Sequence, residues 1–483
     1  MRASKSYVVG MWSESRDYSP TMVGGKGAGL FRMAKTGIPV PPFFVVTVDA
    51  WRTWRDLGRL SDDLKSEIMQ AVRELERATG KSFGGGPDPL LVSVRSAGPV
   101  SMPGMMDTVL NLGLTPASIG AMFQITSNLS FVSKLSNTFL DTFGGLLESE
   151  QIPVQAEEQL FMAVEQVFSS WDNDRARLYR TVRGISHELG TAVVVQAMVY
   201  GNRDALSGTG VLFTRDPASG DPKPRGEWLA GAQGEALVAG RVTPNGLEEL
   251  KAMSPATYEE LINCGKLLEQ QDGFPQDVEF TVEGGKVWVL QTRRLRLSPL
   301  AACRVTMDML SEGIITEEIA AQQLKELDFE KLYVERVEPG NASPLASGIG
   351  ASPGVASGIV VRSVPEALQL VEKGERVVLV RPETTPNDLA GMKVASAIVT
   401  EQGGFTCHAA IVARELRIPC VVGCGSFLDQ LPSNVEVTVD GSTGHVYEGR
   451  MTIFRDVPQF VAKANDILRN FSNDSGVKEV GSL

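Results

Sequence analysis

The chain has 483 residues, 43% hydrophobic and 22% charged, which is ordinary for a soluble globular protein, and at roughly 150 residues per domain this length predicts about three units. Its net charge of −12 argues against nucleic acid as the main partner, because a phosphate backbone requires a basic surface. No apolar run approaches the roughly 20 residues of a membrane helix and the N-terminus does not resemble a secretory signal, so we expect a cytoplasmic protein without a membrane partner.

The first 300 residues mix β-rich runs with amphipathic helical stretches, and strands are expected at residues 90–94, 192–199 and 286–291. Near the start, the segment VGGKGAGL places Lys26 after two glycines. The segment matches neither the P-loop pattern nor the G-x-G-x-x-G fingerprint, so alone it is a weak candidate for binding phosphate. The alternative is a plain turn at the start of a helix.

Arg95 is expected at the end of the strand that begins at residue 90, beside a glycine- and methionine-containing loop at residues 101–107. A guanidinium at a strand end beside a mobile loop suits a polyphosphate, which arginine can bind through two parallel hydrogen bonds. The alternative is an exposed ion pair, the common fate of arginine.

A β-hairpin is predicted around a glycine turn at residues 284–285. Asp277 and Glu279 alternate on the strand before the turn, so both carboxylates face the same side. Gln291 and Arg293 end the strand after it, at the same end of the hairpin. Oxygen ligands beside a cation suit Mg²⁺ bound to phosphates. Judged on these residues alone, a solvated hairpin face is the favoured interpretation.

Helices are expected at residues 306–310 and 316–327, followed by a segment rich in Pro, Gly, Ser and Ala at residues 338–354, whose composition is typical of a flexible interdomain connection. Short strands and helices then alternate up to about residue 450, which predicts a compact α/β domain of about 100 residues. The expected strands are residues 355–361, 376–380, 397–400 and 419–422, and the expected helices are residues 365–373, 408–416 and, before a polar tail, 458–471.

His408 differs from the two other histidines, His187 and His445, for which a structural role is the better interpretation. It follows glycines at 403–404, and Thr406 is the expected N-cap of its helix. In a first helical turn, free N–H groups and the positive end of the dipole favour an anion, and a neutral imidazole is a good nucleophile for phosphorus. These residues fit a phosphohistidine, and the alternative is a histidine that only caps its own helix.

The five cysteines, an odd number in a chain for which no leader is expected, indicate reduced thiols. Cys420 and Cys424 form a C-x3-C pair, and a zinc site there would also need Cys407 and His408. Buried small hydrophobic side chains are the better interpretation.

The segment TTPNDLAGMKVASAIVTEQGGFTCHAAIVARELRIPCVVGCG closely resembles the phosphohistidine segment of the pyruvate phosphate dikinase and phosphoenolpyruvate synthase family. The earlier motifs GGKGAGL, SVRSAGPVSMPGMMDTVLNLGL and QDVEFTVEGGKVWVLQTRR resemble the ATP-grasp domain of the dikinase, in order and nearly throughout. The resemblance implies an α/β and α+β multidomain fold, in which an ATP-grasp nucleotide-binding domain is followed by a swivelling phosphohistidine domain.

The resemblance implies a catalytic role for three residues: His408 carries the phosphoryl group, Arg293 stabilises charge on the transferred group, and Arg95 grips phosphates. The implied substrate is ATP, which the family splits between the α- and β-phosphates, so AMP is the expected nucleotide product. The fate of the γ-phosphate stays open. SMPGMMDT resembles the dikinase, in which phosphate takes it, whereas the Thr-Cys-His form resembles the synthase, in which water takes it.

The resemblance also implies a binding set for ATP and Mg²⁺. This set is Lys26 and Arg95 on the phosphates, Gln196 by the adenine, Asp277, Glu279 and Gln291 on the metal ion, and Arg293. The sequence departs from the family in two places. The family's usual Arg-Ser-Gly reads Arg-Ser-Ala-Gly from Arg95 onward, and the helical insertion at residues 114–169 is shorter than expected.

The expected domains are an ATP-grasp domain at residues 1–300, a helical linker region at 301–345, the phosphohistidine domain at 346–455, and a C-terminal helix and tail at 456–483. The family normally continues into a (β/α)8 barrel that binds pyruvate or phosphoenolpyruvate, and none is expected here. The acceptor is therefore expected on a separate subunit or as another small molecule. The alternative function is that of a nucleotide-binding regulatory, or truncated and non-catalytic, relative of the dikinase.

Overall fold

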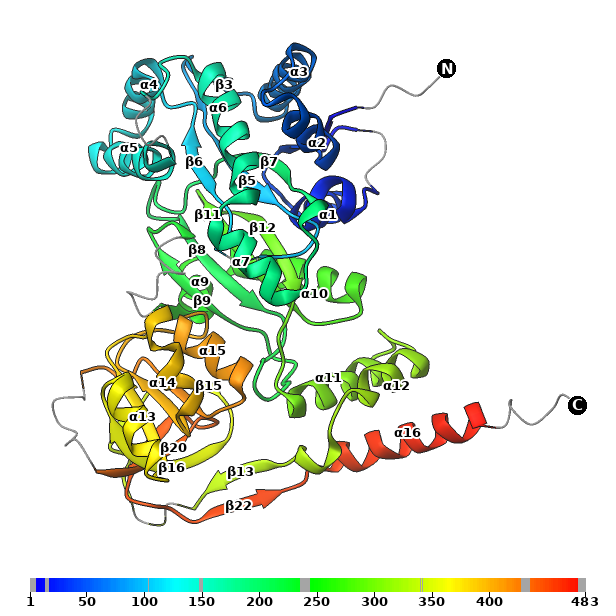
Figure 1. The fold of residues 1–483 in the computed structure, drawn as a ribbon, viewed down its shortest axis with the longest axis vertical. Helices are drawn as coiled ribbons and strands as arrows, with labels where there is room; N and C mark the ends of the chain where they lie inside the picture. Colours follow the sequence, from blue (N-terminus) through cyan, green and yellow to red (C-terminus); the bar gives the residue numbers. More distant parts are fainter. Residues whose placement is uncertain are drawn as a thin grey trace, which may run out of the picture. The chain divides into compact units, whose positions relative to one another are not determined.

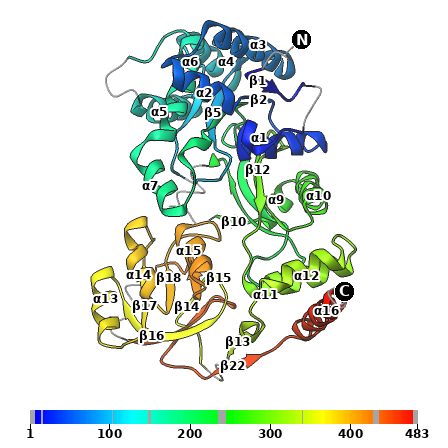
Figure 2. The ribbon, with the colours of Figure 1, turned by 45° about the vertical axis from the view of Figure 1, so that its right-hand side comes forward.

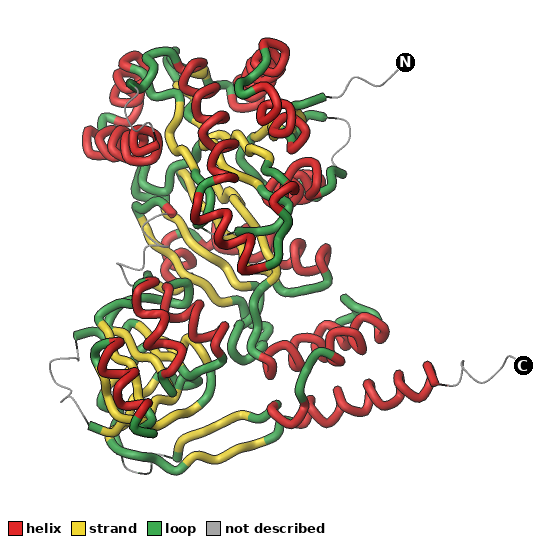
Figure 3. Tube along the Cα trace, in the orientation of Figure 1, coloured by secondary structure: helices red, strands yellow, loops and turns green. Residues whose placement is uncertain are grey.

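The structure, a computed structural model, describes residues 6–13, 17–102, 104–146, 151–234, 244–338, 340, 342–426 and 435–476 (Figure 1). Its contacts divide the chain into two compact units, Met1–Ala205 with Val282–Gln291, and Leu206–Thr281 with Thr292–Leu483. Each unit mixes helices and sheets, which confirms the predicted α/β and α+β multidomain fold (Figure 3). Within the described ranges, no helix is both long enough and apolar enough to cross a membrane.

The first unit is built on a five-stranded antiparallel sheet in the order β1-β2-β7-β5-β6. Its strands are β1 (Val8–Gly10), β2 (Phe43–Val46), β5 (Val92–Ala97), β6 (Thr108–Leu112) and β7 (Ala192–Ala197), with a separate short pair of β3 (Ser82–Phe83) and β4 (Pro89–Leu90). The central strand β7 is buried along its whole length, as its Val-rich sequence favours.

In the described part of this unit, seven α-helices surround the sheet. They are α1 (Pro20–Lys35), α2 (Val48–Leu57), α3 (Asp62–Thr79), α4 (Pro116–Thr126), α5 (Leu129–Phe143), α6 (Ala156–Ser169) and α7 (Asp174–Arg183), with 3-10 turns at Gly144–Leu146, Ser170–Asp172 and His187–Leu189. Large buried side chains from these helices and the sheet form one core, in which the rings of Trp51 and Trp171 meet edge-on at 6.2 Å. This packing fixes α2 and the segment after α6 to the same sheet.

The second unit begins with a five-stranded sheet in the order β10-β9-β8-β11-β12. The strands are β8 (Gly208–Phe213), β9 (Arg225–Ala230), β10 (Asn245–Gly246), β11 (Gln276–Glu283) and β12 (Lys286–Arg294), and the helices α9 (Leu247–Met253) and α10 (Pro255–Asp272) come between β10 and β11. The predicted hairpin is confirmed: Gly284 and Gly285, with φ of 57° and 81°, form the turn between β11 and β12. The chain passes from the second unit to the first within this hairpin.

Residues 346–448 form an eight-stranded sheet in the order β14-β21-β20-β16-β17-β18-β19-β15. Its strands are β14 (Ala346–Ser347), β15 (Ile349–Ser352), β16 (Val355–Val361), β17 (Val377–Arg381), β18 (Ala397–Thr400), β19 (Cys420–Val422), β20 (Glu436–Asp440) and β21 (His445–Glu448). The run β16-β17-β18-β19 is parallel, and the other pairs are antiparallel. The crossover helices are α13 (Val364–Glu372), α14 (Leu389–Val394), preceded by a 3-10 turn at Pro386–Asp388, and α15 (His408–Leu416).

A two-stranded antiparallel ribbon connects this sheet to a group of helices (Figures 1 and 2). It pairs β13 (Val334–Val337), which leads into the sheet, with β22 (Ile453–Asp456), which leads out of it. The helices are α11 (Pro299–Ser311), α12 (Glu317–Lys325) and α16 (Gln459–Gly476), with a 3-10 turn at Phe329–Lys331, and they share a small apolar core. Glu335, on β13, accepts hydrogen bonds at 3.1 Å from Arg455 on β22, which joins the two strands. It also accepts one at 2.9 Å from the backbone N–H of Val355, which joins the ribbon to the start of β16.

Two local predictions are wrong. The segment at residues 338–354 is not a continuous flexible connection, because it contains β14 and β15, whose backbone groups pair with β21 and β19. Arg95 does not end its strand either, since β5 continues to Ala97. In both cases a strand forms or is extended by pairing with a strand from a distant part of the chain. Local composition cannot reveal such pairing.

Candidate active site

His408 is the first residue of α15, as predicted, and it is half-buried. Its Nδ1 atom lies 3.0 Å from the hydroxyl of Thr384, within hydrogen-bond distance. When Nδ1 carries the proton and donates a hydrogen bond to the Thr384 hydroxyl oxygen, the lone pair is left on Nε2. Burial lowers the pKa of His408 below its ordinary value, and the nearby Asp388 carboxylate opposes that shift. This environment favours the neutral, nucleophilic form of the ring.

Thr384 was not among the predicted site residues, and its position is fixed by its neighbours. The next residue, Thr385, caps the 3-10 turn through its reciprocal contacts with Asp388. Asp388 is buried and forms an ion pair with Arg381 at 3.2 Å. The TTPND motif carries the capping pattern from which this turn could have been predicted, but it does not indicate that Thr384 meets the histidine.

The prediction that Thr406 caps the helix of His408 is wrong. The N-cap is Cys407, without a side-chain cap, and the Thr406 hydroxyl instead donates a hydrogen bond to the Glu227 carboxylate at 2.5 Å. These two residues are 179 positions apart, so no local pattern could reveal the contact. Tertiary structure here overrides a local capping preference.

The hairpin brings three of the predicted residues together. Arg293 Nε donates a hydrogen bond to Asp277 Oδ2 at 2.7 Å, and Arg293 Nη2 lies 3.8 Å from Glu279 Oε1. Burial raises the pKa of Asp277 above its ordinary value, although the Arg293 guanidinium opposes that shift. Gln291 lies two residues before Arg293 on β12 and hence faces the same side of that strand.

The residues present fit a phosphate-bound Mg²⁺ ion better than a metal held by protein alone. Asp277 Oδ1 is buried and has no hydrogen-bond partner among the described residues. Glu279, in the same unit and 3.8 Å from Arg293, adds a second carboxylate. Among those same residues, however, no three His, Cys, Asp or Glu side chains gather closely enough to hold a metal. Phosphate oxygens would have to supply the remaining ligands.

Lys26 contacts the strand that carries Arg95, within the first unit. Gly24, with φ of 71°, kinks α1 against the end of β5, where an added Cβ would meet Ala97 O at 1.8 Å. This approach brings the Lys26 ammonium within 3.1 Å of Ser96 O, next to Arg95. The glycines of VGGKGAGL therefore serve close packing as well as a turn.

Gln196 lies on β7, beside the strand that carries Arg95. Arg95 pairs with Val194 on β7, so Arg95 and Gln196 face the same side of the sheet. The Gln196 side chain is buried and donates to Pro41 O at 3.1 Å. Its role beside an adenine stays a prediction. The predicted residues thus fall in two groups: Lys26, Arg95, Gln196 and Gln291 in the first unit, and Asp277, Glu279, Arg293 and His408 in the second.

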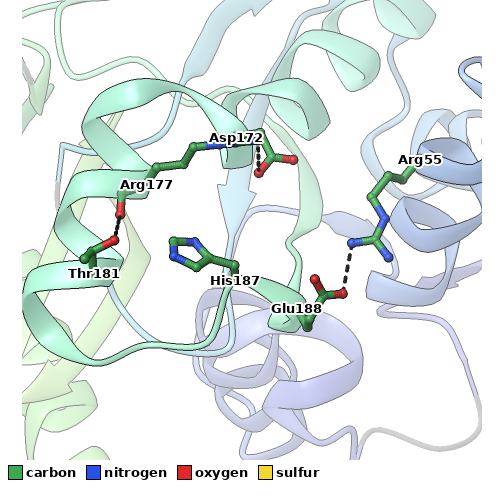
Figure 4. Close-up of a pocket in the computed structure, with 6 residues that line it drawn as sticks. All are labelled: Arg55, Asp172, Arg177, Thr181, His187 and Glu188. Atoms are coloured by element: carbon green, nitrogen blue, oxygen red, sulfur yellow. Dashed lines mark hydrogen bonds and ion pairs between the residues drawn. The ribbon is translucent and has the colours of Figure 1, made fainter.

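A separate cavity of about 500 Å³ in the first unit contains none of the predicted residues (Figure 4). Its lining residues are Arg55, Asp172, Arg177, Thr181, His187 and Glu188. Arg55 pairs with Glu188 at 3.2 Å, and Arg177 pairs with Asp172 at 3.3 Å. His187 accepts a hydrogen bond from Arg180 at its Nδ1 atom, a structural contact. Because both lining arginines are already paired, the cavity presents little free positive charge.

Comparisons with known proteins match both parts of the chain. Residues 52–251 match the family model described as pyruvate phosphate dikinase, AMP/ATP-binding domain, and residues 373–444 match that described as PEP-utilising enzyme, mobile domain. Residues 373–444 contain His408, and residues 52–251 contain Arg95 and Gln196.

Curated relatives match along most of the chain. It is 36% identical to a pyruvate, phosphate dikinase of Clostridium symbiosum over 89% of this chain and 56% of the relative. Identity is also 36% to the protein of that name from Rhizobium meliloti, over 92% and 57%, and to that from Entamoeba histolytica, over 95% and 59%. The chain therefore spans little more than half the length of the curated relatives that it matches.

Proposed function

The chain belongs to the pyruvate phosphate dikinase family, with its AMP/ATP-binding and mobile domains, and from that premise we propose that it transfers a phosphoryl group from ATP to His408. The observation that supports this most is the His408–Thr384 contact at the N-terminus of α15. One ring nitrogen is held by the protein, and the other can attack phosphorus.

The proposed first step is attack by His408 Nε2 on the β-phosphorus of ATP. A bond forms between Nε2 and the β-phosphorus, the bond from that phosphorus to the oxygen bridging to the α-phosphate breaks, and AMP leaves with the electron pair. His408 then carries a pyrophosphoryl group, which becomes a single phosphoryl group when the γ-phosphate passes to phosphate or to water. The free N–H groups at the start of α15 and the helix dipole favour the anion on the ring.

The chain's own charged residues would bind and orient the polyphosphate. Lys26 and Arg95 would grip the phosphate oxygens, and Gln196 would lie by the adenine. Asp277, Glu279 and Gln291 would hold Mg²⁺, which when bound neutralises charge on the phosphates. Arg293, now paired with Asp277, would stabilise charge on the departing group.

The phosphoryl group would then pass from His408 to an acceptor, either pyruvate on a separate subunit or another small molecule. A protein that only bound nucleotide would need neither a histidine at this helix N-terminus nor a second residue to hold it. The alternative is a regulatory or truncated, non-catalytic relative, which would bind ATP without becoming labelled.

The experiment is to incubate the protein with Mg²⁺ and ATP labelled at the β-phosphate. We expect acid-labile, base-stable label on the protein, AMP as the nucleotide product, and no label in His408→Ala, which should still bind ATP. His445→Ala, on β21 of the same sheet, is the matched control and should label normally. Label that survives His408→Ala, or ADP as the sole product, would refute the proposal, and tight ATP binding without label would favour the regulatory alternative.

A further inference from the structure

A second cavity, of about 380 Å³, lies within the second unit. The residues that line it come from β8 and the segment after it, from α10, and from the segment that follows α11. Cavities of this size that combine apolar walls with a few polar groups are the usual binding sites of small molecules. The cavity is therefore a candidate site for a ligand other than ATP.

The cavity and the loop before His408 lie on opposite faces of β8. Val211 and Phe213, on that strand, pack against Phe405 of the loop. Leu212 comes between them and so points to the other face of the sheet, where it lines the cavity. A molecule bound in the cavity would therefore be separated by the sheet from the side that the histidine loop contacts.

Apolar side chains form most of the cavity walls. They are Leu212, Pro222, Pro224, Ile262 and Ile314. Gly265 lets α10 approach β8 closely, because a Cβ added there would lie 2.9 Å from Leu212 Cδ2 and 3.2 Å from Thr214 Cγ2. The helix and the strand thus form two adjoining walls, and an apolar group placed between them would be removed from water.

Buried charged groups form the inner, polar side of the cavity. Arg215 is 3% exposed, and its guanidinium donates to Glu269 Oε1 at 2.6 and 2.8 Å and to the Glu312 carboxylate at 2.6 and 3.3 Å. Burial acts to lower the pKa of Arg215, but the hydrogen bonds to the two carboxylates outweigh it and raise that pKa. One cation is therefore shared between two carboxylates.

Glu269 is the member of this group that lacks a partner. Its side chain lines the cavity and is 8% exposed, and its second oxygen, Oε2, has no hydrogen-bond partner among the described residues. A buried carboxylate oxygen without a donor is costly, so such an oxygen beside a cavity points to a ligand that supplies one. Because the group carries one positive and two negative charges, a cationic donor suits it best.

The outer edge of the cavity carries the opposite charge. Lys266 and Gln270 lie one turn apart on α10 and hence on the same side of the helix. Both are exposed, and neither side chain has a hydrogen bond or an ion pair within the part of the chain that the structure describes. An ammonium and an amide side by side are suited to binding a carboxylate.

We propose that this cavity binds an α-amino acid with an apolar side chain. The ligand's ammonium would donate to Glu269 Oε2, its carboxylate would meet Lys266 and Gln270, and its side chain would pack on the apolar walls. Lys266 and Glu269 are three residues apart on α10, which brings their Cβ atoms within about 6 Å, and an α-amino acid carries both charged groups on one carbon. Because the cavity faces away from the histidine loop, the ligand would be an effector rather than a substrate.

Binding is tested by calorimetry on the whole chain without ATP, with L-leucine and L-phenylalanine as probes. We expect one saturable site per chain, with a Kd in the micromolar to millimolar range that a ligand of this size allows. The matched probes are 4-methylpentanoate, which is leucine without its ammonium, and 3-methylbutylamine, which is leucine without its carboxylate. Each should bind at least about tenfold more weakly, since hydrogen bonds to charged groups contribute that much or more.

Variants at the two ends of the site assign each contact. Lys266→Met should weaken leucine binding about three- to tenfold, as the loss of an exposed ion pair allows, and should leave the binding of 3-methylbutylamine unchanged. Lys266→Arg should retain most of the affinity. Lys325→Met is the matched control, because Lys325 is an exposed lysine on α12 that does not line the cavity.

Glu269→Gln keeps the shape of the side chain and removes its charge. It should reduce the affinity for leucine to that for 4-methylpentanoate, whose own affinity should not fall further. If this variant fails to fold, because Arg215 loses a partner, the analogues and the lysine variants still decide. Backbone hydrogen exchange should locate the ligand, with slower exchange at residues 262–270 when leucine is bound.

The proposal is overturned if neither amino acid binds, or if leucine and 4-methylpentanoate bind equally well. Protection confined to residues outside the cavity lining would also overturn it. None of these measurements depends on phosphotransfer. If leucine binds as expected but the chain acquires no label from ATP, the proposed function fails and the amino-acid site stands, whereas label on His408 without amino-acid binding means the reverse.

Discussion

His408 uses one ring nitrogen to contact the protein, which leaves the other for chemistry. Its partner Thr384 comes from the segment after β17, so the ring orientation depends on two neighbouring crossovers of one sheet. Asp388 fixes the position of that segment, because it accepts a hydrogen bond from the backbone N–H of Thr385 and forms an ion pair with Arg381. A side chain held in this way needs little reorganisation before it attacks.

Replacing Thr384 tests whether this orientation matters. Thr384→Val keeps the shape of the side chain and removes the hydroxyl, so we expect the first-turnover rate of His408 labelling to fall about tenfold, the effect of one lost hydrogen bond. ATP affinity should not change, because Thr384 does not belong to the nucleotide set. Thr384→Ser is the control and should retain most of the rate. Equal rates in Thr384→Val and the unchanged chain would mean that the ring needs no such support.

The lowered pKa of His408 predicts the pH dependence of labelling. The neutral ring is the nucleophile, so the rate is lost as pH falls through the pKa of the folded protein. Because burial lowers that pKa, the acid limb of the rate profile should lie below pH 6.5, the ordinary value for histidine. A titration of His408 by NMR should give the same midpoint as the first-turnover rate measured across pH. An acid limb above pH 6.5 would contradict this environment.

At the scale of elements, the β11–β12 hairpin concentrates charge on one face. Arg293 pairs with Asp277, whose carboxylate is mostly buried, so the guanidinium compensates a charge that would otherwise be buried without a partner. The guanidinium itself remains half-exposed and can contact a ligand. The same arginine thus has a structural partner and a proposed catalytic role.

Arg293→Ala should therefore have two separable effects. We expect the labelling rate to fall by about 100-fold or more, as when a donor to developing charge is removed, with a smaller effect on ATP affinity. The free energy of unfolding should also fall, because Asp277 is left without its cation. Arg293→Lys should recover much of the stability and less of the rate, since lysine cannot present a guanidinium fork. The rate is measured by rapid quench and the stability by urea titration. Loss of affinity with an unchanged rate would refute the catalytic role.

The sequence predicts elements well where the pattern is local, and contacts poorly where it is not. The apolar run at residues 397–400 and the helix at 408–416 occur where expected, because strand and helix periodicity are properties of neighbouring residues. Thr406 was predicted to be a cap because threonine before a helix usually is one. Its actual partner, Glu227, comes from a strand far away in the chain, and no periodicity indicates it. Asp277, Glu279 and Arg293 were placed together because a hairpin is local.

At the scale of the whole molecule, the eight-stranded sheet of residues 346–448, called here the His408 sheet, is attached through two connections that pair with each other. Together β13 and β22 form a ribbon, and Glu335 ties it to the start of β16. A ribbon bends and twists, but it does not permit the free excursions of a single flexible linker. If the histidine must visit both ATP and an acceptor, this ribbon limits where the acceptor can be presented.

Transfer from the phosphorylated protein tests where the acceptor binds. We expect the labelled chain to retain its phosphoryl group when offered pyruvate alone, and to lose it when a partner that binds the acceptor is added. The phosphorylated protein is isolated, mixed with pyruvate in the presence or absence of candidate partner proteins, and assayed for labelled phosphoenolpyruvate. Rapid transfer to pyruvate by the chain alone would refute the proposal of a separate acceptor site.

The paired ribbon also makes the His408 sheet an insertion in topological terms. Val337 and Ile453 are cross-strand partners, so the chain leaves α11 and α12 and returns to α16 at one point. Joining these two residues through an Asn-Gly turn should close a short β-hairpin and leave the packing of α16 on α11 and α12 intact. The shortened protein should still bind ATP, with an unchanged Kd by calorimetry, and acquire no label. The excised segment should fold alone, because two apolar cores lie within it, and of its buried side chains Phe405 packs against Val211, Phe213 and Leu295 outside it. The molecule would then divide into a nucleotide-binding part and a part that carries His408. The second part could be exchanged for another through two cuts, after Val337 and before Ile453, which lie side by side in the ribbon.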